Sequence, residues 1–168
     1  MITSNIHLGR NIRVPKGSSL NNVKIGDNTK LASEVKLFGS EDNILEVGEG
    51  CYFGMNCFIE GYNAKVIIGD FVSFSPMVTI ISGSGPNASE LMQRIYPITK
   101  GPVNIGDHCW IGGNSVITPN VSIGKFCIVG SNSFVNKSFP DYSVIGGTPA
   151  KLIRTLSDSE KEKLHSND

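Results

Sequence analysis

Residues 105–136 read IGDHCWIGGNSVITPNVSIGKFCIVGSNSFVN, and a large aliphatic residue recurs in this stretch at every sixth position. The recurring residues are Ile105, Ile111, Ile117, Ile123, Val129 and Val135. A hexapeptide period sustained over six repeats predicts a solenoid, because each short unit buries its apolar side only when the next unit stacks on it. The period therefore decides the fold class before any local propensity is considered.

The same spacing occurs upstream in groups of three. Three hexapeptides make one turn if each contributes one short strand, so we predict a triangular coil with three parallel sheets. Six such coils, stacked at the spacing of neighbouring strands, make a prism about 30 Å long. The upstream groups are Leu8, Val14 and Leu20; Ile25, Leu31 and Leu37; Val47, Phe53 and Ile59; and Ile68, Phe74 and Ile80.

The four cysteines share one position of the repeat. The fourth residue after each recurring aliphatic residue is small or β-branched nearly throughout, which marks a second inward position near a corner. We interpret the cysteines as small buried apolar residues rather than metal ligands or disulfide partners. No metal site is predicted, because no two histidines lie at ligand spacing. The cysteines are Cys51, Cys57, Cys109 and Cys127.

The repeat is interrupted most strongly between Ile80 and Ile105, where residues 81–104 form a predicted inserted loop. Loops of this length in a compact domain are usually functional. After the last coil, Ser157 and Glu160 have the spacing of a capping box and predict a short C-terminal helix. We expect a β-helix domain over residues 1–154, followed by a helix and tail over residues 155–168.

Composition excludes several classes of protein. Lys plus Arg and Asp plus Glu number 15 each among 168 residues, and the charged fraction of 18% lies below the roughly 25% of typical domains. Such a balance argues against a binder of nucleic acid or of anionic membranes. No stretch approaches the roughly 18 apolar residues of a membrane span, and residues 1–10 lack an apolar leader. We expect a cytoplasmic protein.

The segments IGDHCWIGG at 105–113 and GGTPAK at 146–151 carry a resemblance. They resemble the hexapeptide-repeat acyltransferases, most closely the xenobiotic, maltose and galactoside O-acetyltransferase branch, over about residues 20 to 155. The resemblance implies an all-β fold, a left-handed parallel β-helix. It also implies a homotrimer with active sites between subunits, acetyl-CoA as acyl donor, and a sugar or glycan precursor as acceptor.

Matching positions imply which residues bind the donor. Residues along the pantetheine arm of CoA would be Trp110, Gly112, Gly113, Ser131, Thr148, Pro149 and Ala150. Residues placed to meet the CoA phosphates would be Lys137, Lys151 and Arg154, because cations pair well with phosphate.

The catalytic base departs from the family pattern. The resemblance implies a loop histidine that accepts the proton of the attacking hydroxyl, but residues 81–104 contain no histidine and Gly85 stands at the matching position. His108, at an outward position of the repeat, is one candidate base. Its alternative is an ordinary polar surface residue. Glu90 is the other candidate, and it serves only if burial between subunits makes it a stronger base.

Asn56 matches an asparagine that orients the acceptor in the sugar acetyltransferases. A corner asparagine with left-handed backbone explains the residue equally well.

Two functions therefore remain open. The first is a CoA-dependent O-acyltransferase, with N-acyl transfer to an amino sugar as a variant of the same chemistry. The second is a non-catalytic trimeric scaffold or binding protein, which the absent loop histidine favours.

Overall fold

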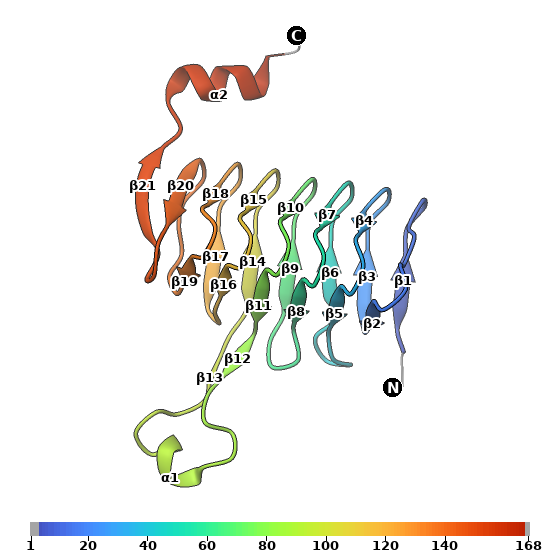
Figure 1. The fold of residues 1–168 in the computed structure, drawn as a ribbon, viewed down its shortest axis with the longest axis vertical. Coiled ribbons are helices and arrows are strands. Elements are labelled where there is room, and N and C mark those ends of the chain that lie inside the picture. Colours follow the sequence, from blue (N-terminus) through green and yellow to red (C-terminus); the bar gives the residue numbers. More distant parts are fainter. Residues whose placement is uncertain (1–3, 167–168) are drawn as a thin grey trace.

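A computed structural model of the chain describes residues 4–166 and has the form of a three-sided prism built from stacked coils. Figure 1 shows the coils side by side along the prism, from β1 near the N-terminus to β20 and β21 near the C-terminus. The fold is a left-handed parallel β-helix, as expected. Each complete coil contributes one short strand to each of three sheets.

The strands of one sheet come from successive coils and pair in parallel, except where β21 turns back on β20. The first sheet contains β1 (Ile6–Leu8), β3 (Val23–Ile25), β6 (Leu45–Val47), β9 (Val66–Ile68), β14 (Val103–Ile105) and β17 (Val121–Ile123). The second contains β4 (Lys30–Leu31), β7 (Tyr52–Phe53), β10 (Ser73–Phe74), β15 (Trp110–Ile111), β18 (Ile128–Val129), β20 (Ser143–Gly146) and β21 (Lys151–Thr155). The third contains β2 (Ser19–Asn21), β5 (Lys36–Phe38), β8 (Phe58–Glu60), β11 (Thr79–Ile81), β16 (Val116–Ile117) and β19 (Phe134–Val135).

The core lies inside the prism and follows the predicted period. Every predicted inward aliphatic residue from Leu20 to Val135 is buried. Leu8 and Val14 are 42% and 40% exposed, because they belong to the first coil and no further coil covers them. The four cysteines are buried with free thiols, which confirms their inward placement. Burial raises the pKa of the Cys51 and Cys57 thiols to about 11.

The chain turns at the three edges of the prism, which we number in the order in which they occur along each coil. The first edge joins the first sheet to the second, the second edge joins the second to the third, and the third edge leads to the next coil. At the first two edges the corner residue of most coils has left-handed backbone, for example His108 with φ 57° and Asn114 with φ 57°. Short polar and glycine residues tolerate this conformation best, which accounts for many of the asparagines.

The inserted segment leaves at the third edge after β11. Its stem is an antiparallel pair, β12 (Gly83–Ser84) with β13 (Thr99–Lys100), and its tip carries the short helix α1 (Glu90–Gln93). The buried carboxylate of Glu60 fixes the root, because it accepts hydrogen bonds from the Ser82 hydroxyl at 2.9 Å and the Tyr62 amide at 2.9 Å. The structure thus shows the predicted excursion after β11, whereas residues 81, 103 and 104 of the predicted loop belong to strands of the prism.

The C-terminal helix α2 (Asp158–His165) begins at the predicted capping box of Ser157 and Glu160. The sequence did not predict β21, whose pairing with β20 extends the second sheet before α2 begins. The expected domain division after residue 154 falls inside β21, before its last residue. Neither α1 nor α2, the helices of the described segment, has the length and hydrophobicity required to cross a membrane.

Candidate functional site

Most of the residues assigned to the donor lie together on the second edge. The Asn114 amide donates to the Pro76 carbonyl at 3.0 Å, and the Asn132 amide donates to the Gly113 carbonyl at 2.9 Å. The Thr148 hydroxyl then donates to the Asn132 carbonyl at 3.0 Å. These bonds join consecutive corners, so they align Gly112, Gly113, Ser131 and the 148–150 turn along one edge.

The two glycines keep this edge narrow. A Cβ on Gly112 would lie 2.5 Å from the Ser131 nitrogen, so the stacked coils leave no room for a side chain. A Cβ on Gly113 would lie 3.1 Å from the Pro76 carbonyl oxygen. Their absent side chains therefore allow the neighbouring coils to stack closely at this edge.

Trp110 joins this group through its side chain. It points outward from β15 and is 55% exposed. Its indole N–H donates to the Ser75 hydroxyl at 3.2 Å, and Ser75 belongs to a corner of the second edge. The indole therefore lies against the second edge with its apolar ring accessible to a ligand.

Asn56 lies on the second edge as well. Its backbone has φ 59°, so the interpretation as a corner residue is confirmed. The side chain is exposed. The Met77 amide donates to the Met55 carbonyl at 2.9 Å, which joins the corner of Asn56 to the corner of the next coil, and that corner is in turn bonded to Asn114 beside the donor glycines. Its role toward an acceptor remains a prediction.

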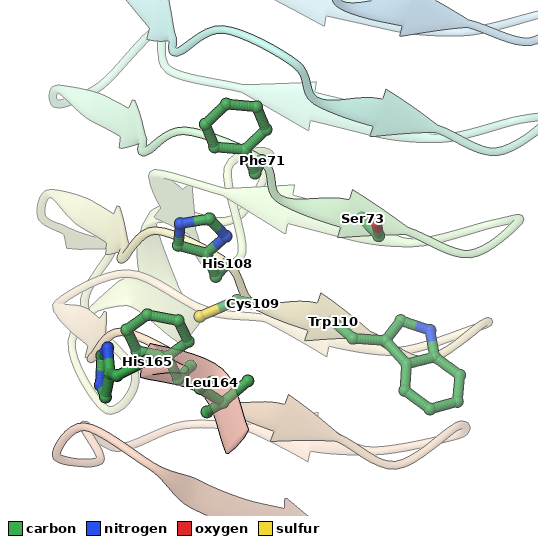
Figure 2. Close-up of a pocket in the computed structure, with 8 residues that line it drawn as sticks. Phe71, Ser73, His108, Cys109, Trp110, Leu164 and His165 are labelled. Carbon is green, nitrogen blue, oxygen red and sulfur yellow. The ribbon is translucent and has the colours of Figure 1, made fainter. Parts of the chain in front are cut away.

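His108 lies at the first edge, across the second sheet from the donor residues. Its ring stacks between those of Phe71 and Phe126, with centroids 5.1 and 4.9 Å away. Tyr142 continues the stack at 5.4 Å from Phe126. We call Phe71, His108, Phe126 and Tyr142 the aromatic column. His165 of α2 packs edge-on against Phe126 beside this column (Figure 2).

Sequence reasoning missed the aromatic column, although a signal was available. Each of its four members lies three residues after an inward residue of the first sheet. In the first three cases that inward residue is the last residue of a strand, and in the fourth it is the bridge residue Phe139. Equivalent positions in consecutive coils lie one above another, so rings at this position stack. The column gives His108 a packing role whether or not it takes part in catalysis.

Glu90 is the first residue of α1, on the excursion from the third edge, and its side chain is exposed. Figure 1 shows α1 and α2 on opposite sides of the prism. His108, Asn56 and Glu90 thus belong to three different edges. One chain alone does not bring them together.

Gly85, at the position of the absent histidine, is packed against the other arm of the stem. A Cβ there would lie 2.8 Å from the Ile98 Cα. A side chain at this point requires the backbone of residue 98 to move.

The three predicted phosphate-binding cations have different surroundings. Lys151 is exposed on β21, and Lys137 lies at the third edge with its ammonium 5.5 Å from the Phe139 ring centre. The Arg154 guanidinium forms two hydrogen bonds to the Glu160 carboxylate, at 2.7 and 2.8 Å. This pair holds the pKa of Glu160 at about 2. Much of the hydrogen-bonding capacity of Arg154 is therefore used within the chain.

Comparison with known proteins agrees with the repeat and the fold. A profile described as bacterial transferase hexapeptide (six repeats) matches residues 102–137. Nodulation protein L of Rhizobium meliloti (strain 1021) is 42% identical over 108 residues, which are 64% of this chain and 58% of that protein. Galactoside O-acetyltransferase of Escherichia coli (strain K12) is 31% identical over 140 residues, covering 82% of this chain and 66% of that protein.

Solved structures share the architecture. A maltose O-acetyltransferase from Clostridium difficile 630 superposes with a TM-score of 0.53 and 28% identity, covering 94% of this chain and 70% of that one. AntD, an N-acyltransferase from Bacillus cereus in complex with dTDP and 3-hydroxybutyryl-CoA, superposes with a TM-score of 0.79 at 23% identity, covering 93% and 86%. The latter likeness concerns the fold alone.

The repeat, the three-sided prism and the second edge define a hexapeptide-repeat β-helix protein. The chain belongs to the hexapeptide-repeat transferase family, in which its relatives include galactoside and maltose O-acetyltransferases. It spans about three fifths of the length of the curated relatives it matches.

Proposed function

We propose that the protein transfers an acyl group, namely acetyl, from coenzyme A to a hydroxyl of a sugar or glycan precursor in the cytoplasm. The observation that carries this proposal is the second edge, where Trp110, Gly112, Gly113, Ser131 and the 148–150 turn form one continuous track. The named relatives support the same chemistry, since they include O-acetyltransferases that act on galactosides and maltose.

The track suits an extended thioester. The Trp110 indole offers an apolar surface and the exposed residues Ser131 and Thr148 offer polar groups along which the pantetheine arm would lie, and Lys151 would supply a cation near its end. The acceptor hydroxyl then attacks the thioester carbonyl, a base takes the hydroxyl proton, and CoA leaves as the thiol. The chain must therefore supply a base beside the track.

Assembly into a trimer would supply what one chain lacks. The outer face of the third sheet is rich in apolar side chains, including Phe38 and Phe58, whose rings meet edge to face at 6.0 Å. Phe134 and Val116 extend this face toward later coils. A flat apolar face of this kind favours burial against identical copies.

The tip of the excursion also needs a partner. Leu91 and Ile95 are each 69% exposed, and α1 buries none of its residues. Met55 and Met77 are exposed on the second edge, beside Asn56. We propose that the tip of one subunit packs against these methionines of its neighbour.

This packing would make Glu90 the base. The carboxylate begins α1 beside Leu91 and would be enclosed with it between subunits, where loss of water makes a carboxylate a stronger base. His108, in contrast, already serves the aromatic column. Glu90 of one subunit and Asn56 of the next would then flank the acceptor hydroxyl.

The test is a thioester-release assay with acetyl-CoA over a panel of sugars, amino sugars and nucleotide sugars. We expect acceptor-dependent release of the CoA thiol, with O-acetyl product identified by mass. An N-acetyl product would redirect the proposal to an amino acceptor.

A trimeric scaffold is the second candidate, and the absence of any histidine in residues 81–104 favours it. It predicts a trimer that binds CoA without turnover for any acceptor in the panel.

A further inference from the structure

An open groove of about 660 Å³ crosses the outer face of the second sheet beneath the end of α2. Figure 2 shows Phe71 and His108 of the aromatic column on one side and Trp110 on the other. Ser73 of β10 lies on the floor, and Leu164 of α2 closes the groove from above. This volume falls in the range of small-molecule sites, about 300–1,000 Å³.

The aromatic wall is held in place before any ligand arrives. The rings of Phe71, His108 and Phe126 are within 11° of parallel in each successive pair, and each restrains the next. The Trp110 N–H is already bonded to Ser75, so the indole offers the groove its ring and no donor. A rigid wall costs little conformational entropy when it binds.

The polar character of the lining restricts the ligand. Among the described residues that line the groove, none is a lysine, arginine, aspartate or glutamate. The polar side chains are the Ser73 hydroxyl, the buried Cys109 thiol and the imidazoles of His108 and His165. Sugars and phosphates require more hydrogen-bonding or charged partners than this.

Helix α2 leaves apolar surface exposed to water at the groove. Leu164 remains 45% exposed where α2 crosses the groove, and α2 buries none of its residues. A flat ring placed between Trp110 and the aromatic column, beneath Leu164, would remove apolar surface of Trp110 and Leu164 from water. It would also meet the ring edges of the column, which is a favourable aromatic arrangement.

We propose that this groove binds an uncharged compound with a flat aromatic ring system. Its hydroxyl or ring nitrogen would pair with Ser73 or an imidazole, and its rings would lie between Trp110 and the aromatic column. Binding there requires no acyl transfer. The groove shares Trp110 with the donor track, so the variant that tests the groove is placed at Leu164 on α2, away from that track.

The 168-residue chain contains one tryptophan, so its indole N–H resonance in a ¹⁵N spectrum reports directly on the groove. The probe is 2-naphthalenemethanol, and its matched control is the fully saturated decahydro analogue. We expect a saturable shift of the Trp110 resonance with the naphthyl compound and at least fivefold weaker binding of the saturated one. Methyl β-glucoside should cause no saturable shift.

A pair of variants locates the binding. Leu164→Ala should weaken naphthyl binding at least threefold, whereas Ile67→Ala, which truncates an exposed residue of the first sheet, should leave it unchanged. Both side chains are at least 40% exposed, so neither substitution threatens the fold. The proposal is overturned by the absence of a saturable shift, by equal affinity for the saturated analogue, by preference for the glucoside, or by equal effects of the two variants.

Discussion

At the scale of single residues, His108 shows how packing and chemistry compete for one side chain. Its imidazole sits in a column of parallel rings, and its left-handed backbone is the conformation of its corner. A phenylalanine occupies the equivalent position in the coils before and after it. The stack therefore needs an aromatic ring at this position, but it does not need the imidazole nitrogens of a histidine.

His108→Phe should accordingly preserve both the fold and acyl transfer, with turnover within about threefold of the parent. His108→Ala should lower stability by about 1–2 kcal/mol, because it removes two ring pairs. Thermal unfolding and thioester release measure the two effects. A folded His108→Phe trimer that binds CoA but has lost turnover would identify His108 as the base instead.

Glu90→Gln should lower turnover by about 10²- to 10⁴-fold, the usual contribution of a general base, while CoA affinity stays the same. Glutamine keeps the size of the side chain, so the tip of the excursion should pack unchanged. Glu41→Gln, at another exposed carboxylate in a loop, is the matched control. Full turnover in Glu90→Gln would contradict the proposed role of this residue.

Lys151 is the cation of the donor site that has most freedom to meet a phosphate. Lys151→Ala should weaken CoA binding by about 1–3 kcal/mol, the cost of one charged hydrogen bond. Calorimetry with CoA and with 3′-dephospho-CoA shows which phosphate it meets. Lys16→Ala, an exposed lysine in the first coil, should have no effect. Equal affinity of Lys151→Ala and the parent for both ligands would remove Lys151 from the site.

At the scale of elements, α2 is attached by few contacts. Arg154 of β21 pairs with Glu160, and the Tyr142 hydroxyl and His165 Nε2 lie 3.2 Å apart. Because α2 buries no residue, these polar contacts govern how often it leaves the prism.

The Arg154–Glu160 pair gives this attachment a predictable dependence on pH. The guanidinium holds the pKa of Glu160 at about 2, whereas a free glutamate titrates near 4.3. A lowered carboxyl pKa stabilises the docked helix above about pH 4.3, and the gain disappears as the pH falls toward 2. The effect is modest because both side chains are largely solvated.

Hydrogen exchange of the α2 amides, compared between the parent and Arg154→Gln, measures this contribution. The parent should be better protected at pH 5 and above, and the difference should vanish as the pH falls to about 2. All other groups are shared by the two proteins, so the comparison isolates the contribution of Arg154. A difference that persisted at pH 2 would show that Arg154 acts through another contact.

The sequence predicts most of the elements but not the last hairpin. The hexapeptide period predicted the inward residues, the interruption after Ile80 predicted the excursion, and Ser157 with Glu160 predicted the start of α2. The hairpin of β20 and β21 was not foreseen, because β21 is exposed along its length and lacks the inward alternation of a core strand. Its pairing is stabilised by the backbone of β20.

At the scale of the whole molecule, the described faces of the prism differ in polarity. The third sheet carries Phe38, Phe58 and Phe134 outward, whereas the first sheet carries mainly polar residues such as Asn104 and Ser122. We therefore expect the third sheet to lie between subunits.

Sedimentation should give a mass three times the 18.1 kDa of one chain at micromolar concentration. Phe134→Asp should dissociate the assembly, because it places a charge in the apolar face. Ile67→Asp, at an exposed position of the first sheet, is the matched control and should remain trimeric. A monomeric parent would refute the trimer, and dissociation by Ile67→Asp alone would move the interface to the first sheet.

The sequence by itself determined which residues point inward. Successive side chains alternate along a short strand and the corners recur at a constant interval, so the period alone places Leu20 through Val135 and all four cysteines in the core. The interpretation of Asn56 as a corner residue also followed, since asparagine tolerates left-handed backbone, whereas the bulky left-handed corners Phe71, Phe126 and Tyr142 did not.

Only the tertiary structure decided which corners are neighbours. Members of one edge are separated by 18 to 37 residues in pairs such as Asn114 with Asn132 and Asp70 with Asp107, and the intervals between coils vary. Stacking converts these unequal intervals into contacts about 4.8 Å apart along the prism. It gathered Gly113, Ser131 and Thr148 on one edge and placed His108 in a ring column on another. A side chain's neighbours depend on how the coils stack, which no single period along the chain specifies.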